Sequence, residues 1–131
     1  STDQLYKGPP ACKCTIGENL AHLVRYHEFF EERIKKILTG KRPRFGRYKA
    51  EEDPLFESWL DFNTAEIILK TKKKRVEIAA KLLKLSDEQI CKTGIHPKLG
   101  EMDIIAWTEF FLLHESHHFY TIFWLRHGLP R

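Results

Sequence analysis

Five consecutive residues near the C-terminus combine side chains that bind transition metals: His114, Glu115, Ser116, His117 and His118. Together they form a literal H-E-x-x-H pattern. On an α-helix, residues four apart lie on one face about one turn apart, so two histidines at this spacing can ligate one cation. The pattern is typical of the zinc-binding helix of metalloproteases. A pair of hydrogen-bonded histidines in a helical core would give the same spacing, so the spacing alone does not distinguish the two interpretations.

The protease interpretation requires a further ligand downstream of the motif. In the extended pattern H-E-x-x-H-x-x-G-x-x-H, glycine would occupy position 121 and histidine position 124, where this chain has Thr121 and Trp124. The other common arrangement uses a downstream Glu or Asp, and no carboxylate side chain follows Glu115. The sequence therefore argues against a protease. Glu115 projects about 100° away from His114 on a helix and is interpreted as a surface or supporting carboxylate.

A third metal ligand must then come from upstream, where the candidates are His22, His27 and His96. His27 lies at the centre of the apolar stripe of a predicted helix, whereas His22 lies about 120° away from that stripe. Periodicity alone favours His27 as the histidine that points inward. That preference weakens if the helix packs on two sides, as helices of bundles often do.

The first predicted helix begins at Thr15 and ends at Gly40. Thr15 and Glu18 form a T-x-x-E capping box, and apolar residues then recur at steps of three and four. The second helix begins with Asp53 as N-cap and Pro54 at the first helical position, and it continues for about thirty residues without a breaker. Residues 40–53 between them form a basic loop. Ser86 and Gln89 predict a short capped turn after the second helix.

The last predicted helix runs from about Glu101 to Arg126 and follows a loop at residues 93–100. One stripe carries His114 and His118 among aromatic residues, so both histidines point into the protein. A helix that is apolar nearly all round is central or covers a partner subunit. No segment alternates as a strand does, so we predict an all-α bundle of three long helices. On the last predicted helix, the face opposite the histidines is also apolar and carries Ile105, Leu112, Phe119 and Phe123.

Length and composition fit one soluble domain over residues 1–131, with an irregular, proline-rich segment at 1–14. Hydrophobic residues make up 42% of the chain and charged residues 31%, as in ordinary globular proteins. No apolar run approaches the roughly 20 residues that span a bilayer, and no signal peptide is apparent, so we expect a cytoplasmic protein without membrane contact. The net charge of +4 is a weak nucleic-acid signal, and the basic runs at 41–49 and 70–75 are interpreted as solvated surface.

The chain has three cysteines, an odd and sparse set that does not suggest a disulfide framework. Cys12 and Cys14 have a poor spacing for a zinc site and are interpreted as incidental. Cys91 has apolar neighbours and is expected to be a small core residue.

Two stretches taken together resemble the DinB-like (YfiT-like) family. They are T-I-G-E-N-L-A-H-L-V-R-Y-H-E at residues 15–28 and H-P-K-L-G-E-M-D-I-I-A-W-T-E-F-F-L-L-H-E-S-H-H at residues 96–118. The E-x-x-x-H-L block, the H-P-x-x-G loop and the final H-x-x-x-H occur in the family's order. The resemblance implies an up-and-down four-helix bundle that is often a homodimer. The family has a helix before the E-x-x-x-H-L helix, so this chain would carry a short or missing first helix.

The resemblance also implies a divalent metal, zinc or nickel among others, held by three histidines. Carried over by motif, these are His22, His114 and His118, so the family favours His22 where periodicity favours His27. His27 remains a candidate for lining the pocket. The family includes thiol S-transferases that use low-molecular-weight thiols and proteins described as metal-dependent hydrolases. For hydrolysis, Glu18 or Glu115 would be the candidate base. A non-catalytic, metal-stabilised binding module is the alternative.

Overall fold

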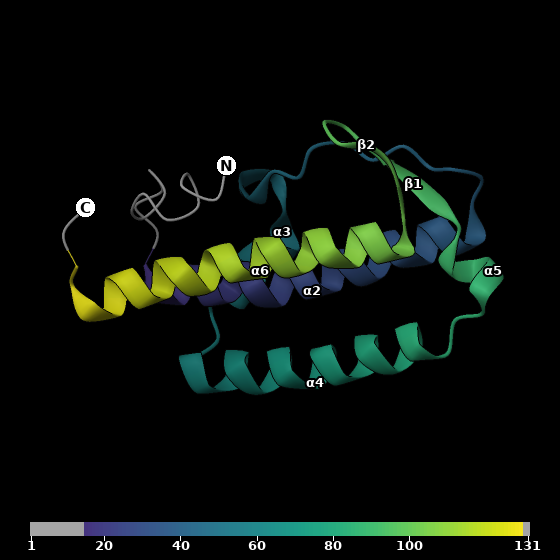
Figure 1. Ribbon diagram of the computed structural model, residues 1–131. Helices are drawn as coiled ribbons and strands as arrows, with labels where there is room; N and C mark the ends of the chain where they lie inside the picture. The colour runs from purple at the N-terminus through teal and green to yellow at the C-terminus, as the bar shows by residue number, and fades with distance from the viewer. Residues whose placement is uncertain (1–14, 130–131) are drawn as a thin grey trace.

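The computed structural model describes residues 15–129. Three long helices, α2, α4 and α6, make up most of this part of the chain (Figure 1). In chain order the elements are α2 (Ile16–Thr39), η1 (Ala50–Glu52), α3 (Pro54–Trp59), α4 (Thr64–Leu83), α5 (Asp87–Ile90), β1 (Thr93–His96), β2 (Gly100–Asp103) and α6 (Ile104–His127).

α2 is the central helix and packs against both α4 and α6 (Figure 1). The predicted all-α bundle of three long helices is therefore confirmed. Residues 40–63 return along the bundle, so α2 and α4 run in the same direction and α6 runs against them (Figure 1). Successive long helices thus do not simply alternate in direction.

The boundaries of α2 follow the predicted signals. The Thr15 hydroxyl accepts a hydrogen bond from the Glu18 amide at 3.1 Å, and the Glu18 carboxylate accepts one from the Thr15 amide at 3.4 Å. This reciprocal pair satisfies two amides that the first turn leaves without partners. At the other end, Gly40 caps the helix through its own amide, which donates to the Lys36 carbonyl.

The predicted second helix is interrupted, and the prediction of one unbroken helix is wrong. Asp53 caps α3 as expected and Pro54 follows it, but α3 ends at Trp59. A new N-cap, Asn63, accepts a hydrogen bond from the Glu66 amide at 2.9 Å and begins α4. Two helices of different direction replace one because a side-chain cap inside the apolar pattern starts a second helix.

The predicted loop at residues 93–100 is in fact part of a short antiparallel hairpin, so the expectation of no strands is wrong. β1 pairs with β2 from Thr93 opposite Asp103 to His96 opposite Gly100. Gly100 has a φ of 80°, a conformation that favours glycine. Because β2 runs to Asp103, α6 begins at Ile104, later than predicted, and the Asp103 carboxylate caps it.

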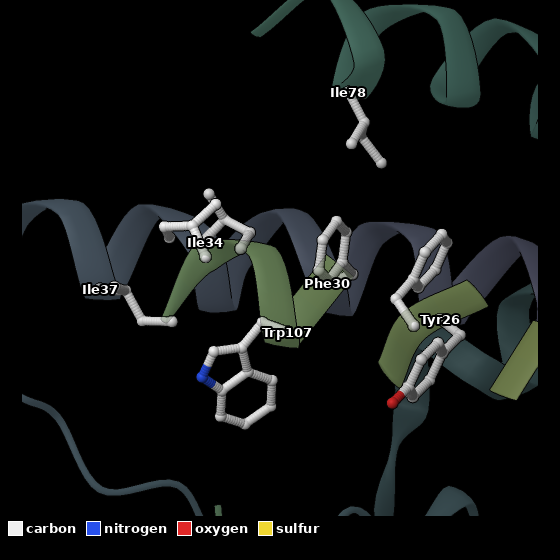
Figure 2. Packing of buried hydrophobic residues seen from close by; sticks show 8 residues of the cluster. Tyr26, Phe30, Ile34, Ile37, Ile78 and Trp107 are labelled. Carbon is white, nitrogen blue, oxygen red and sulfur yellow. The ribbon is translucent and has the colours of Figure 1, made fainter. Parts of the chain in front are cut away.

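The core lies where α2, α4, α6 and the hairpin meet (Figure 2). The Trp107 side chain is 1% exposed, and its indole N–H donates to the Gly94 carbonyl at 3.3 Å. Gly94 leaves no room for a side chain: an added Cβ would lie 2.8 Å from carbons of both Ile37 and Phe45. The buried cluster consists of Tyr26, Phe30, Ile34, Ile37, Ile78, Ile104, Trp107 and Phe111.

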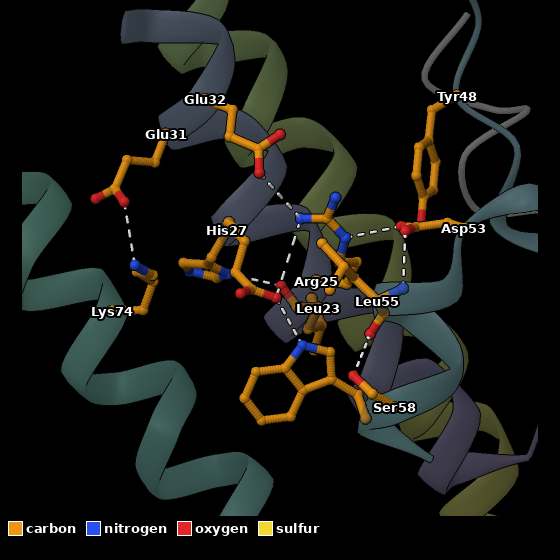
Figure 3. A network of polar contacts seen from close by, with 12 residues as sticks. Leu23, Arg25, His27, Glu31, Glu32, Tyr48, Asp53, Leu55, Ser58 and Lys74 are labelled. Atoms are coloured by element: carbon orange, nitrogen blue, oxygen red, sulfur yellow. Dashed lines mark hydrogen bonds and ion pairs between the residues drawn. The ribbon is translucent and has the colours of Figure 1, made fainter.

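The basic segment at residues 40–53 is fixed at both ends rather than free. Near its start, the Phe45 amide donates to the Ile95 carbonyl and the Ile95 amide donates to the Pro43 carbonyl. At its end, Asp53 Oδ2 accepts hydrogen bonds from Arg25 Nε at 2.7 Å and from the Tyr48 hydroxyl at 2.8 Å (Figure 3). This segment therefore forms a wall held against α2 and β1.

Three sequence expectations concern the surface. Cys91 is exposed, not a core residue, because α5 is a single turn at the edge of the fold. In the run at 70–75, Lys74 and Arg75 do not simply face solvent: they form ion pairs with Glu31 and Glu115. Cys12 and Cys14 lie outside the described residues. Within residues 15–129, no helix has the length and apolar character needed to cross a membrane.

Candidate metal centre

Three histidines from two distant parts of the sequence meet between α2 and α6. His22 lies on α2, and His114 and His118 lie one turn apart on α6. The ring centroids of His22 and His118 are 5.2 Å apart, and those of His114 and His118 are 4.9 Å apart. The two helices pack side by side, which brings together the three residues that the family motif selected (Figure 1). We call these three side chains the histidine cluster.

Aromatic rings flank the cluster on two sides. The Tyr26 ring stacks on His114 with centroids 3.8 Å apart, and the Phe56 ring stacks on His22 at 4.3 Å. Tyr26 comes from α2 and Phe56 from α3, so the break after Trp59 leaves α3 as a short cover over His22. The stacking restricts the orientations of both imidazoles.

Asn19 fixes the third histidine. Its Oδ1 lies 3.0 Å from His118 Nδ1, and its Nδ2 donates to the Thr15 carbonyl at 2.9 Å. The second hydrogen bond orients the amide so that its oxygen faces the imidazole. His118 Nδ1 therefore donates, and Nε2 is left without a proton. A supporting hydrogen bond of this kind orients a histidine ligand and selects the nitrogen that can bind a metal.

The environment keeps the cluster neutral at pH 7. Burial, followed by the nearby imidazoles, lowers the pKa of His118 to about 3 and that of His114 to about 4. Burial also lowers the pKa of His22, opposed by the negative charge of Glu18. Neutral imidazole is the form that ligates a metal.

The donor set fits a divalent transition metal, but the rings need to turn. His114 Nδ1 is buried and has no hydrogen-bond partner within residues 15–129, as expected of a nitrogen that coordinates a metal ion. The His22 and His118 rings are stacked nearly parallel, with 19° between their planes. In this arrangement, no three His, Cys, Asp or Glu side chains of the described residues are grouped so as to hold a metal ion. Binding would require His22 to rotate out of its stack.

The histidine cluster lines an open cavity of about 400 Å³. The segment at residues 47–51 forms the opposite wall. Among the described residues, the lining contains one carboxylate, Glu51, which is exposed. The complete lining is His22, Tyr26, Arg47, Tyr48, Lys49, Ala50, Glu51, His114, His117 and His118.

His27 points inward, but toward α4 rather than toward this cavity (Figure 3). It is 1% exposed, and its Nδ1 lies 2.7 Å from the Leu23 carbonyl. Its Nε2 lies 3.3 Å from the Glu115 carboxylate, which also pairs with Arg75 on α4. The expectation that His27 lines the pocket is therefore wrong. The two histidines thus contact different faces of α6: His22 stacks on His118, and His27 lies beside Glu115.

The other sequence candidates lie apart from the cluster. His96 Nδ1 accepts hydrogen bonds from the Lys98 and Leu99 amides, both at 3.0 Å, and organises the hairpin turn. Neither Glu18, which caps α2, nor Glu115 lines the cavity. The two carboxylates considered as a hydrolytic base are thus placed elsewhere.

Several residues of the site were not identified from the sequence. Asn19, Tyr26 and Phe56 contact the cluster, and Arg47 lies on the opposite wall. A signal existed for Asn19, because a polar residue three positions before His22 shares its helix face. Phe56 and Arg47 come from segments whose position depends on tertiary structure, so no local pattern could place them.

Comparisons with known proteins agree with this fold. The family model of the DinB superfamily matches residues 1–122. Among solved structures, the chain is similar to YfiT from Bacillus subtilis, which is described as a probable metal-dependent hydrolase with an unusual four-helix bundle topology. The TM-score is 0.72 at 19% sequence identity, over 99% of this chain and 76% of YfiT. No curated protein sequence gives a significant match.

Proposed function

The chain belongs to the DinB superfamily, and from this premise we propose that it is a metal-dependent enzyme whose divalent ion is held by His22, His114 and His118. One observation carries the proposal: two neutral histidines of α6 and one of α2 gather at the wall of an open cavity. Zinc and nickel are among the ions that suit imidazole ligands. Three protein ligands leave a position for water or substrate, as in catalytic sites.

When bound, such an ion would act as a Lewis acid that acidifies a water or a thiol. The residues of the chain position the reactants: Asn19 orients His118, and Tyr26 and Phe56 restrict the other two rings. Residues 47–51 line the same cavity and would face the reactants.

Of the two chemistries, thiol S-transfer suits the cavity better than hydrolysis. Hydrolysis needs a base held beside the attacking water. In the described lining the candidates are the exposed Glu51 and His117, and no side-chain hydrogen bond within the described residues orients either of them. A thiolate is already a nucleophile and needs no such base. It would form a bond to an electrophilic carbon of the second substrate, whose leaving group departs with the electron pair. We propose a low-molecular-weight thiol as one substrate.

We also propose that the protein is a homodimer. Four apolar side chains on the outer face of α6 are at least 39% exposed, which is unusual for one continuous helix surface. A second subunit would cover them. These residues are Ile105, Leu112, Phe119 and Phe123.

An activity screen tests the proposed function. Protein loaded with zinc or nickel would be assayed for transfer of cysteine to a chlorinated dinitrobenzene and for hydrolysis of p-nitrophenyl acetate. We expect metal-dependent thiol transfer that is lost in His118→Gln. A protein that binds the metal at the histidine cluster and turns over neither substrate would instead be a metal-stabilised binding module, which is the competing hypothesis.

A further inference from the structure

A second cavity of about 270 Å³ adjoins the histidine cluster. It shares four lining residues with the first cavity, so the two form adjacent parts of one site: Tyr26, Arg47, Tyr48 and His114. Its charged lining residues are Arg33, Arg47 and Lys98, and its described lining contains no carboxylate. The cavity therefore concentrates positive charge beside His114.

Arg33 is a buried cation without an anionic partner. It is 6% exposed and forms no ion pair with a carboxylate of residues 15–129. Within the described residues, the Arg33 guanidinium makes one hydrogen bond, and it is long: Nη2 donates to the Gly46 carbonyl at 3.3 Å. The Arg33 Nε atom is buried without a hydrogen-bond partner there. Burying an unpaired charge is costly, so a guanidinium in this state is suited to receive an anion from outside.

Aromatic rings hold the guanidinium in place but cannot satisfy it. The Arg33 Cζ atom lies 4.3 Å from the centroid of the Phe29 ring and 5.2 Å from the Trp107 ring. These contacts offset part of the desolvation and limit the motion of the side chain. They supply no acceptor in the plane of the N–H groups, which an oxyanion would.

Three further side chains of the cavity, Arg47, Lys98 and His96, are also donors. Arg47 and Lys98 are exposed and form no ion pair within the described residues. Since His96 Nδ1 accepts two amide hydrogen bonds, the proton of the neutral ring is on Nε2, which can donate. Tyr26, Pro97 and Phe110 provide apolar walls between these donors.

We infer that this cavity binds the oxyanion of an organic substrate, a carboxylate or a phosphate, between Arg33, Arg47 and Lys98. The substrate's apolar body lies along Tyr26 and Phe110, and its reactive end extends past His114 to the histidine cluster. That the bound anion belongs to the substrate rests on the proposed function, whereas anion binding itself does not require the metal.

The test uses metal-free, full-length protein at low ionic strength and isothermal titration calorimetry with three probes of similar size. Benzoate and phenyl phosphate carry the two oxyanions, and benzamide is the neutral analogue. We expect at least one anion to bind and benzamide not to bind measurably. The tighter of the two anions identifies the substrate's charged group. Equal binding of benzamide and the anions, or no binding of any probe, would overturn the inference.

Variants then locate the site. Arg47→Gln should weaken anion binding roughly tenfold, because one charge-assisted contact is lost. Arg44→Gln makes the same change of charge in the same segment, but Arg44 does not line this cavity. The anion affinity of Arg44→Gln should therefore stay within about twofold of the wild-type value, because long-range charge effects are screened. Both residues are exposed, so neither variant threatens folding. Equal effects of the two variants would contradict the inference.

A double comparison separates this inference from the proposed function. His118→Gln should weaken metal binding at least roughly tenfold and keep anion binding, whereas Arg47→Gln should weaken anion binding roughly tenfold and keep metal binding. A wild-type protein that binds benzoate but no metal would refute the proposed function and leave the anion site intact. A protein that binds metal but no anion would refute the anion site alone.

Discussion

The Glu115 carboxylate lies 3.3 Å from Nε2 of His27 and is directed away from the cavity that His114 and His118 line. In a zinc protease the glutamate of the H-E-x-x-H motif faces the same space as its histidines. Here it forms an ion pair with Arg75 and joins α6 to α2 and α4. The motif therefore divides between two faces of α6: the histidines line the cavity, and the glutamate stabilises the bundle.

Removing the charge of Glu115 should weaken the fold and spare metal binding. Glu115→Gln leaves Arg75 without its anionic partner in a half-buried position, so we expect the free energy of unfolding to fall by about 1–3 kcal/mol. Urea denaturation measures it, with Glu109→Gln, an exposed glutamate on the same helix, as control. If the binding free energy for the metal fell by more than the free energy of unfolding, Glu115 would have to contribute to the metal site.

Acid should destabilise the metal-free protein through the histidine cluster. In the unfolded chain both histidines become protonated below the ordinary histidine pKa of 6.5. In the folded protein, the pKa of His114 is about 4 and that of His118 is about 3, so both stay neutral to lower pH. The unfolded state thus binds more protons, and the free energy of unfolding decreases as the pH falls from 7 to 5, by about 2 kcal/mol for each histidine.

Comparison with a His114→Gln/His118→Gln variant isolates this contribution, because the carboxylates with lowered pKa values are retained in both proteins. Urea denaturation of both proteins at pH 7 and pH 5 gives the difference. Equal losses of stability in the two proteins would contradict the burial of neutral imidazoles.

Gly94 should tolerate no side chain. Its added Cβ would lie 2.8 Å from Ile37 and Phe45 carbons, so Gly94→Ala should lower the free energy of unfolding by about 1–3 kcal/mol through overpacking. Gly46→Ala is the matched control, since nothing lies within 4 Å of its added Cβ. Thermal unfolding monitored by circular dichroism compares the two. Similar melting temperatures would argue against the close contact of β1 with α2.

Asp53 should hold residues 40–53, which include the cavity wall, in place. The Asp53 carboxylate accepts hydrogen bonds from Arg25 and Tyr48 and caps α3. Burial raises the pKa of Asp53, but the hydrogen bonds from Tyr48 and Arg25 and the charge of Arg25 outweigh it, so the pKa is lowered. Asp53→Asn should therefore loosen residues 40–53 and speed tryptic cleavage after Arg47 and Lys49 several-fold. Asp61→Asn, an exposed change nearby, serves as control. Unchanged cleavage would indicate that the contacts with β1 suffice.

Local signals were sufficient to predict most helix boundaries. The capping box at Thr15, the N-cap at Asp53 and the short turn begun by Ser86 are all confirmed. Each depends on hydrogen bonds within a few residues, which sequence spacing encodes directly. The N-cap at Asn63 carries the same kind of signal, and the continuous apolar pattern around it concealed it.

Features that depend on tertiary contacts could not be predicted in this way. The hairpin at residues 93–103 is too short for a recognisable alternation and is stabilised by its contact with residues 43–45. Periodicity could not choose between His22 and His27, because it reports that a side chain is buried and not which neighbour buries it. His22 and His27 lie on different sides of α2 and contact different faces of α6: His22 stacks on His118, and His27 lies beside Glu115.

The most direct test of the central claim is calorimetric titration of the metal-free protein with zinc and nickel. We expect the wild type to bind one ion per chain. We expect at least a roughly tenfold loss of affinity in His22→Gln and His118→Gln, since each removes one ligand, and little change in a folded His27→Gln variant. A wild-type protein that binds neither ion, or a site that survives His22→Gln but is lost in His27→Gln, would contradict the proposed three-histidine metal site.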